Sequence, residues 1–166
     1  MDNLETARLV LHPISVNEAE RVVSGDPDGG ARWAPGYPAE GEVRASRRFL
    51  DTCASTGDPR PFGNYEIRRR EDGYAIGGVG FHATPDQDGG VSIGYGLVPA
   101  ARGNGYASEA LRALLEFARA QGVTSVAGDT DHGNTASQHV MAAAGMQLIA
   151  EDEQLKYYKI TWLDAA

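Results

Sequence analysis

Along the chain, hydrophobic and polar residues change their spacing several times, and each change predicts the start of a new helix or strand. Residues 7–14 (ARLVLHPI) alternate well enough to predict a first strand. Residues 15–25 (SVNEAERVVSG) predict a short helix that begins at Ser15, carries Glu18 three residues later and stops at Gly25. A serine followed by a glutamate at this distance has the spacing of a capping box, which supports the predicted helix start.

The next segment, residues 26–42, contains four Gly and three Pro and predicts a long irregular connection. Long connections inside a domain are often functional, and this one carries Trp33 and Tyr37. The alternative is that both aromatic side chains simply fill the hydrophobic core. Residues 42–55 (EVRASRRFLDTCAS) predict a second helix.

Between residues 62 and 97 the hydrophobic period changes to two, which is typical of strands. Three strand-like runs are separated by the sequences EDG and TPDQDGG, which are typical of turns between antiparallel strands. The runs are residues 62–70 (FGNYEIRRR), 74–83 (YAIGGVGFHA) and 91–98 (VSIGYGLV).

The helical period then returns, followed by a strand at 123–130, a helix at 134–145 and two strands, of which the last is 155–162. The element order β-α-α-β-β-β-α-β-α-β-β predicts one domain of mixed α/β class over residues 1–166. The first helix of this half ends at Gly122, and its predicted apolar face consists of Ala107, Ala110, Leu111, Leu114, Leu115 and Ala118.

Composition and charge exclude several functional classes. The chain has 166 residues, of which 42% are hydrophobic and 23% charged, with no apolar run long enough to cross a membrane and no recognisable signal peptide. One cysteine, Cys53, excludes an intramolecular disulfide and agrees with a cytoplasmic location. The net charge of −8 argues against a nucleic-acid or anionic membrane surface and mildly favours a cationic partner, such as an amine.

A glycine-spaced loop at a predicted helix start between Arg102 and Ala107 carries the strongest chemical signal. A strand, a glycine loop and a helix in succession direct free backbone N–H groups and the positive end of the helix dipole toward an anion. Gly103 and Gly105 let the backbone approach a phosphate closely, and Arg102 adds a cationic donor. The alternative is that the two glycines only form a tight turn.

The loop sequence GNGYAS nearly matches the dinucleotide fingerprint G-x-G-x-x-G, but Ser108 stands in place of the third glycine. Asp129 lies about where an acidic residue could bind a ribose. However, the loop follows a long stretch of other structure, and the strands before it are predicted to be antiparallel. A Rossmann domain, and with it a nicotinamide-dependent oxidoreductase, therefore fits poorly.

Two motifs in register resemble the GCN5-related N-acetyltransferases (GNAT), in particular the branch that contains the ribosomal-protein N-terminal acetyltransferases. Residues 102–107 (RGNGYA) match the family's Arg/Gln-x-x-Gly-x-Gly/Ala loop, and residues 134–146 (NTASQHVMAAAGM) resemble its Asn-x-x-Ser segment. The resemblance spans residues 61–162. It implies a GNAT-like single domain with a central, mostly antiparallel sheet of six or seven strands, splayed in the middle and flanked by four helices.

The resemblance implies acetyl-CoA as the cofactor and transfer of its acetyl group to a primary amine by direct attack in a ternary complex. The loop amides would hold the pyrophosphate, and backbone groups at the end of the preceding strand would pair with the pantetheine. Ser137 would hydrogen-bond or protonate the departing sulfur, unless it bonds only to backbone as an early-helix serine. The residues assigned to the cofactor in this way are Gly96, Leu97, Val98, Arg102, Gly103, Asn104, Gly105, Tyr106, Ala107, Ser108, Asn134 and Ser137.

Many relatives carry a glutamate at the position of Ser92, and a serine cannot act as a base at neutral pH. Glu66 is the best substitute, because strand alternation places it on one face with Asn64 and Arg68; the alternative is a plain ion-paired surface. His82 titrates in a suitable range, although a histidine at a strand end is often structural. Two histidines near the Asn-x-x-Ser segment are weaker candidates: His132 and His139.

The acceptor side is the least defined part of the site. The resemblance implies that Trp33 and Tyr37 wall it, and a protein N-terminus, a polyamine, an aminoglycoside or another small amine all remain open. No metal is predicted, and a homodimer is left open because members of the family are often dimers. Since Ser92 replaces the usual glutamate, a non-catalytic acyl-CoA-binding or regulatory module is the alternative to an enzyme.

Overall fold

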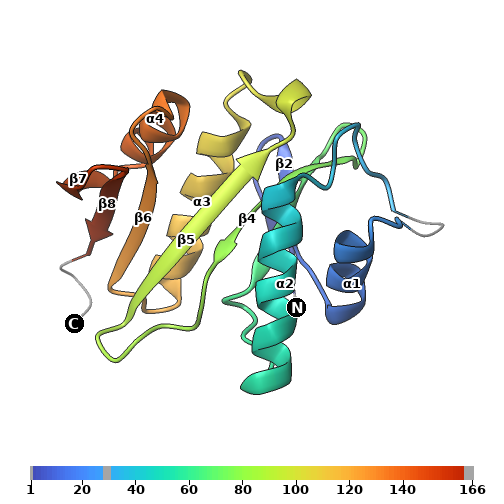
Figure 1. Ribbon diagram of the computed structural model, residues 1–166, viewed down its shortest axis with the longest axis horizontal. Helices are drawn as coiled ribbons and strands as arrows, with labels where there is room; N and C mark the ends of the chain where they lie inside the picture. Colours follow the sequence, from blue (N-terminus) through green and yellow to red (C-terminus); the bar gives the residue numbers. More distant parts are fainter. Residues whose placement is uncertain (1, 28–30, 163–166) are drawn as a thin grey trace.

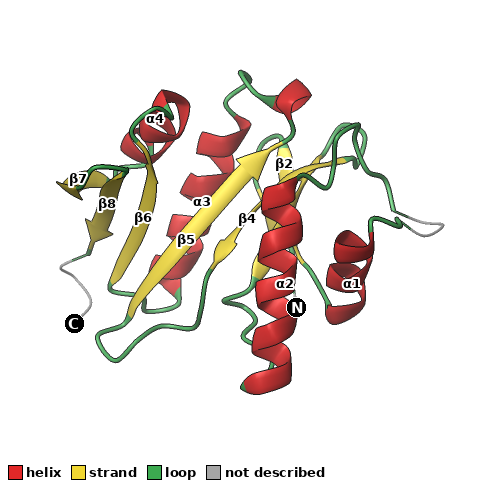
Figure 2. Cartoon of the chain, viewed as in Figure 1, coloured by secondary structure: helices red, strands yellow, loops and turns green. Residues whose placement is uncertain are grey.

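A splayed sheet with helices on both faces forms the core of the molecule (Figure 1; Figure 2). The computed structural model describes residues 2–27 and 31–162. In this part of the chain eight strands form one sheet in the order β1-β2-β3-β4-β5-β6-β8-β7, and every neighbouring pair is antiparallel except β5–β6. The strands are β1 (Leu4–Glu5), β2 (Leu9–Pro13), β3 (Asn64–Arg69), β4 (Ala75–Phe81), β5 (Gly90–Leu97), β6 (Ser125–Asp131), β7 (Gln147–Glu151) and β8 (Leu155–Thr161).

Four α-helices of the described residues cover the sheet. They are α1 (Val16–Ser24), α2 (Glu40–Ser55), α3 (Tyr106–Ala120) and α4 (Thr135–Ala143), and a 3-10 turn spans Pro99–Ala101. Figure 1 shows α1 and α2 in front of the sheet and α3 behind it. None of the helices in the described residues is long and apolar enough to cross a membrane.

The predicted mixed α/β fold is confirmed, with more strands than the six or seven expected. The additional strand is β1, which has only two residues and therefore carries no hydrophobic alternation that would reveal it in the sequence. β7 is the strand predicted before 155–162, and all five of its residues are exposed. Helix α2 starts at Glu40, two residues earlier than its predicted start.

Short sequence patterns predicted the start of α1 and the buried face of α3 correctly. Ser15 caps α1, and the reciprocal hydrogen bonds with Glu18 form the predicted capping box. Gly25 follows α1 with φ +76°, a conformation that favours glycine. The predicted apolar face of α3 is buried against the sheet at every position except the partly buried Ala107: Ala110, Leu111, Leu114, Leu115 and Ala118.

The sheet opens between its two central strands, as expected. β5 pairs with β4 from Ile93 to Leu97 but with β6 only from Gly90 to Ser92. Figure 1 shows the two strands diverging toward the end of β5, next to the start of α3. One edge of β5 therefore faces a gap directly beside the glycine loop.

Candidate active site

The glycine loop presents a row of backbone amides at the start of α3. Gly103 and Gly105 have φ values of +84° and +79°, and Gly105 is the N-cap residue of the helix. Among the described residues, no amide from Gly103 to Ser108 donates a hydrogen bond to a protein group. No atom lies within 4 Å of the position that a Cβ at Gly103 would occupy. The loop is thus open to a ligand that brings hydrogen-bond acceptors to these amides.

Arg8 holds this loop, although no local pattern in the sequence indicated it. Its Nη1 donates to the carbonyl oxygen of Asn104 at 2.8 Å, its Nε lies 2.7 Å from Glu109 Oε1, and its guanidinium carbon lies 4.6 Å from the centroid of the Tyr106 ring. A second arginine, Arg102, donates from Nε to a carbonyl oxygen at the end of β5. The contact of Arg8 with the loop spans 96 residues, which is why a search of neighbouring residues could not reveal it.

The backbone N–H groups of β5 that face the gap between β5 and β6 are not the expected ones. The Val98 N–H donates to Ile76 O, so the expectation that this amide is free is wrong. Because backbone groups of successive strand residues point in alternate directions, Gly96 also faces β4, whereas Tyr95 and Leu97 direct their N–H groups toward the gap. The register between β4 and β5 decides this, and the sequence does not specify it to one residue.

Asn134 and Ser137 lie across the gap at the start of α4. Asn134 is the N-cap residue, and its Oδ1 accepts the Ser137 N–H at 3.0 Å. The Tyr95 hydroxyl lies 2.7 Å from Ser137 Oγ and donates to the Ser137 carbonyl oxygen at 3.0 Å. Ser137 therefore bonds to more than backbone, and burial raises the pKa of its partner Tyr95. Sequence reasoning missed Tyr95, which the GYG segment contains without any distinguishing spacing.

A cavity of about 170 Å³ lies under α2, on the opposite face of the sheet from α3. Its floor contains Gly78, Gly80 and Gly94 of β4 and β5, and the absence of side chains there lets Asn64 pack against Gly80 and His82 against Gly94. The predicted residues Tyr37, Glu66 and His82 all line it, whereas Trp33 and Ser92 are not among its lining residues. The lining residues are Ile14, Tyr37, Gly41, Glu42, Arg44, Ala45, Ser46, Arg48, Asn64, Tyr65, Glu66, Gly78, Val79, Gly80, His82 and Gly94.

The two predicted aromatic residues are divided between this cavity and a neighbouring hollow. Tyr37 is buried in the cavity, and Trp33 lines a hollow of about 260 Å³ together with Arg32 and Arg68. The two rings meet edge to face, with centroids 5.5 Å apart. Only Tyr37 is therefore placed to touch a molecule inside the cavity.

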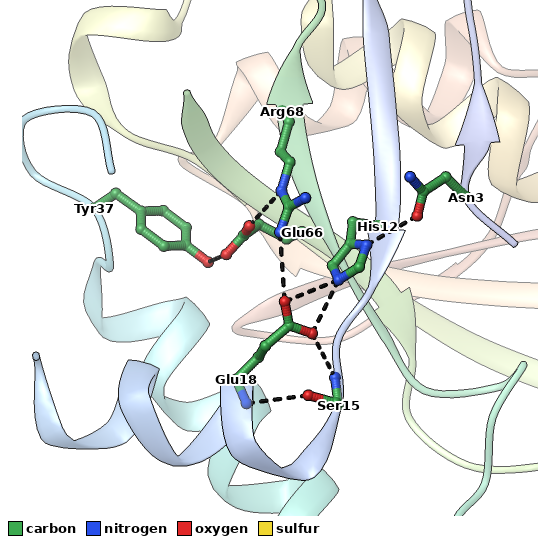
Figure 3. Close-up of polar contacts among 7 residues, drawn as sticks. All are labelled: Asn3, His12, Ser15, Glu18, Tyr37, Glu66 and Arg68. Atoms are coloured by element: carbon green, nitrogen blue, oxygen red, sulfur yellow. Dashed lines mark hydrogen bonds and ion pairs between the residues drawn. The ribbon is translucent and has the colours of Figure 1, made fainter. Parts of the chain in front are cut away.

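Glu66 is the centre of a polar network that Figure 3 draws. Its Oε2 accepts a hydrogen bond from the Tyr37 hydroxyl at 2.7 Å, and its Oε1 accepts one from Arg68 Nε at 2.7 Å. Arg68 also reaches Glu18 at 3.5 Å, and His12 Nε2 lies 2.9 Å from the same carboxylate. Glu66 therefore belongs both to the cavity and to an ion-paired cluster, so each of the two alternatives for its strand face describes part of what is observed.

Burial and the charges in this network shift two pKa values in opposite directions. Burial, followed by the negative charge of Glu66, raises the pKa of Tyr37 well above its ordinary value. At Glu18 burial opposes ionisation, but hydrogen bonds from His12 and Ser15 outweigh it and lower the pKa to about 2. Glu18 is therefore a carboxylate at every pH at which the protein is expected to work.

His82 lies at the rim of the cavity, next to Gly94. Its Nε2 is 2.9 Å from the position that a Cβ at Gly94 would occupy, so only glycine leaves room for the ring. Desolvation and then the positive charge of Arg48 lower the pKa of His82, which favours a neutral imidazole at pH 7. The other two candidate histidines, His132 and His139, are exposed and are not among the lining residues.

Glu42 is a further cavity residue that the sequence analysis did not single out. Its side chain is only 9% exposed, and its Oε1 accepts the Ala39 N–H at 3.0 Å. Its Oε2 lies 3.5 Å from the position that a Cβ at Gly96 would occupy. The signal that could have identified it is a glutamate three residues into the helix, the reciprocal half of a capping box, but Ala39 supplies no side-chain cap.

Known proteins with similar sequences are acetyltransferases by name. The uncharacterized N-acetyltransferase YjdG of Bacillus subtilis (strain 168) is 25% identical over 162 residues, which covers 93% of this chain and 95% of the relative. The uncharacterized N-acetyltransferase YoaA of the same strain is 26% identical over 145 residues, with 87% and 82% covered.

Solved structures share the fold over the whole chain. The ribosomal-protein-S5-alanine acetyltransferase from Vibrio fischeri superposes with a TM-score of 0.73 at 15% identity and full coverage of both chains. The ribosomal L7/L12 alpha-N-protein acetyltransferase RimL, solved in complex with coenzyme A, has a TM-score of 0.72 at 16% identity and covers 99% of this chain and 100% of its own.

The family assignment follows from the match of residues 8–147 to the family model of the acetyltransferase (GNAT) domain. That match includes the glycine loop, the Asn-x-x-Ser segment and the cavity under α2. The chain belongs to the GNAT acetyltransferase family, and the prediction made from its two motifs is confirmed.

Proposed function

We propose that the protein transfers an acetyl group from acetyl-CoA to a primary amine that enters the cavity under α2. The observation that carries this proposal is the open row of amides from Gly103 to Ser108, which lies beside the gap between β5 and β6. The proposal treats residues 1–166 as one acetyltransferase domain that acts in the cytoplasm.

The proposed cofactor site follows the gap. The loop amides and Arg102 would hold the two phosphates, because backbone N–H groups at a helix start and a guanidinium both favour anions. The N–H groups of Tyr95 and Leu97 would pair with the pantetheine amides, and Asn134 would contact the same arm from α4. Acetyl-CoA would supply an acetyl thioester, whose C–S bond breaks as the amine nitrogen forms its bond to the carbonyl carbon.

The remaining polar groups would move two protons. Ser137, hydrogen-bonded to Tyr95, is proposed to face the sulfur and to deliver a proton to it. A primary ammonium has an unperturbed pKa near 10.4 and must lose a proton before its nitrogen can attack. The proposed acceptors of that proton are the basic groups of the cavity: Glu42, Glu66 and the neutral imidazole of His82.

The experiment for this function combines calorimetry with a thiol-release assay. Coenzyme A should bind with measurable heat and NAD should not. Acetyl-CoA should release thiol above the background rate with at least one amine from a panel of peptides, polyamines, aminoglycosides and small amines. Tight binding of coenzyme A without turnover on any amine would instead support the non-catalytic module. No heat at millimolar coenzyme A would reject both, and sedimentation of the same sample would test for a homodimer.

A further inference from the structure

The carboxylate of Glu42 is buried without a cation. Glu18, Glu66 and Glu109 each lie within ion-pair distance of an arginine or histidine, but among the described residues no such group lies that close to Glu42. Its hydrogen-bond donors in the helix start are the Ala39 N–H, on Oε1, and the backbone N–H of Glu42 itself. A buried carboxylate that lacks a counter-ion is costly unless a cationic ligand completes it.

Glu42 also lies closer than Glu66 to Gly96, near the end of β5 where the thioester is proposed to bind. Glu42 Oε2 lies over Gly96, and its Cγ is 3.5 Å from the position that a Cβ at Gly78, the β4 partner of Gly96, would occupy. Glu66 belongs to β3, two strands from β5, which corresponds to about 10 Å of strand spacing. Both oxygens of Glu66 are in addition hydrogen-bonded to protein groups.

We infer that Glu42 binds the ammonium group of the acceptor and takes its proton before attack. This assignment rests on the function proposed above. One N–H bond of the ammonium breaks, its electron pair stays on nitrogen, and the proton bonds to Glu42 Oε2 and later passes to solvent. Glu42 and Gly78 both line the cavity under α2, so an amine that enters this cavity would reach the carboxylate.

The charged neighbours of Glu42 are consistent with this role. Burial raises its pKa. The hydrogen bonds from the backbone N–H groups of Ala39 and Glu42, and then the positive charge of Arg102 from the loop after β5, act against that rise. Tyr37 from the irregular segment, Glu66 from β3 and Arg44 from the same helix also line the cavity. A carboxylate with a raised pKa is a better proton acceptor than an ordinary one, because efficiency improves as its pKa approaches the working pH.

The test is the Glu42→Gln variant, compared with Glu40→Gln. The amide oxygen of the substituted side chain can still accept the Ala39 N–H, so the helix start is preserved, while the side chain no longer takes up a proton. Glu40 lies in the first turn of the same helix and is exposed. With the panel amine of highest kcat/KM, Glu42→Gln should lower kcat by roughly 10²-fold or more and remove the acidic limb of the pH–rate profile. Glu40→Gln should change neither, and the Kd for coenzyme A should be the same in all three proteins.

A measurement without acetyl-CoA supplements the kinetics. In protein with carbon-13-labelled glutamate side chains, the carboxyl signal that disappears in Glu42→Gln should titrate above the ordinary range. The same panel amine should bind the coenzyme A complex of Glu42→Gln at least 10-fold more weakly than it binds the wild-type complex.

The outcomes separate this inference from the proposed function. A wild-type enzyme that turns over, together with a Glu42→Gln variant within twofold of it and with an unchanged acidic limb, overturns the role of Glu42 alone. A wild type that binds coenzyme A but acetylates no amine overturns both. If Glu42→Gln does not fold, Glu42→Asp takes its place: an acidic limb with kcat lowered at least 10-fold supports the role, and a wild-type rate overturns it.

Discussion

The Tyr37 hydroxyl donates a 2.7 Å hydrogen bond to Glu66 Oε2 and so joins the irregular segment before α2 to the third strand of the sheet (Figure 3). Both residues are buried, with 8% of each exposed. The cavity under α2 therefore has a wall whose position depends on one hydroxyl and one carboxylate that are 29 residues apart in the sequence.

Removing the Tyr37 hydroxyl should lower the stability of the protein. We expect Tyr37→Phe to lower the free energy of unfolding by about 1–2 kcal/mol, because Glu66 Oε2 loses a donor in a buried place. Urea unfolding measures this change, and the Kd for coenzyme A should not move. Tyr74→Phe is the matched control, since Tyr74 is 38% exposed and its hydroxyl removal should cost little. Equal unfolding curves for both variants would show that the Tyr37–Glu66 bond contributes nothing.

Glu66→Gln should act on stability more than on proton transfer. Its amide can keep a bond to Tyr37, but Arg68 loses the carboxylate at 2.7 Å and keeps the longer contact with Glu18. We expect a loss of about 1–2 kcal/mol in unfolding free energy and an acidic limb of the pH–rate profile that persists. Glu71→Gln, in the exposed turn after β3, serves as the control. If Glu66→Gln instead lost the acidic limb of the pH–rate profile, Glu66 and not Glu42 would be the proton acceptor.

Glu18 should make stability depend on acidic pH. Its pKa falls from 4.5 to about 2 in the folded protein, so its contribution is complete above the unfolded value and is lost as pH falls from about 4.5 to about 2. Because Glu18 is partly solvated, we expect wild type to lose only about 1–2 kcal/mol more than Glu18→Gln between pH 5 and pH 2.5. Urea unfolding at a series of pH values measures the difference. Parallel curves for the two proteins would contradict the shift.

Gly105→Glu should prevent binding of coenzyme A. The new carboxylate would stand at the start of α3, where the phosphates are proposed to bind, and two like charges at one site repel. Calorimetry should show at least a 100-fold weaker Kd. Gly122→Glu is the control, because Gly122 also has a positive φ, +87°, but lies beyond the opposite end of the same helix. Similar losses in both variants would point to backbone strain instead of the phosphate site.

Tyr95 and Ser137 should act as a coupled pair. The 2.7 Å contact between their hydroxyls crosses the gap between β5 and α4, so removing either one also changes the hydrogen bonding of the other. We expect Ser137→Ala to lower kcat about 10-fold or more, and Tyr95→Phe to add little once Ser137 is gone. A double-mutant cycle on kcat at a fixed amine concentration measures the coupling. Strictly additive effects would separate the two hydroxyls.

The two segments that are proposed to bind the cofactor could be identified from the sequence. The loop at 102–107 and the Asn-x-x-Ser segment are each a single short stretch of sequence. The backbone amides that they expose follow from the local geometry of a helix start. The face shared by Asn64 and Glu66 followed from strand alternation.

By itself the sequence determined the helices, most strands, the family and the position of the glycine loop, because each depends on residues that are neighbours along the chain. Tertiary structure alone decided that Arg8 grips the loop, that Val98 turns its amide away from the gap, and that Glu42 stands over Gly96. These contacts join elements far apart in sequence, and they depend on strand register and helix placement, which are set by packing of the whole core and not by any local pattern.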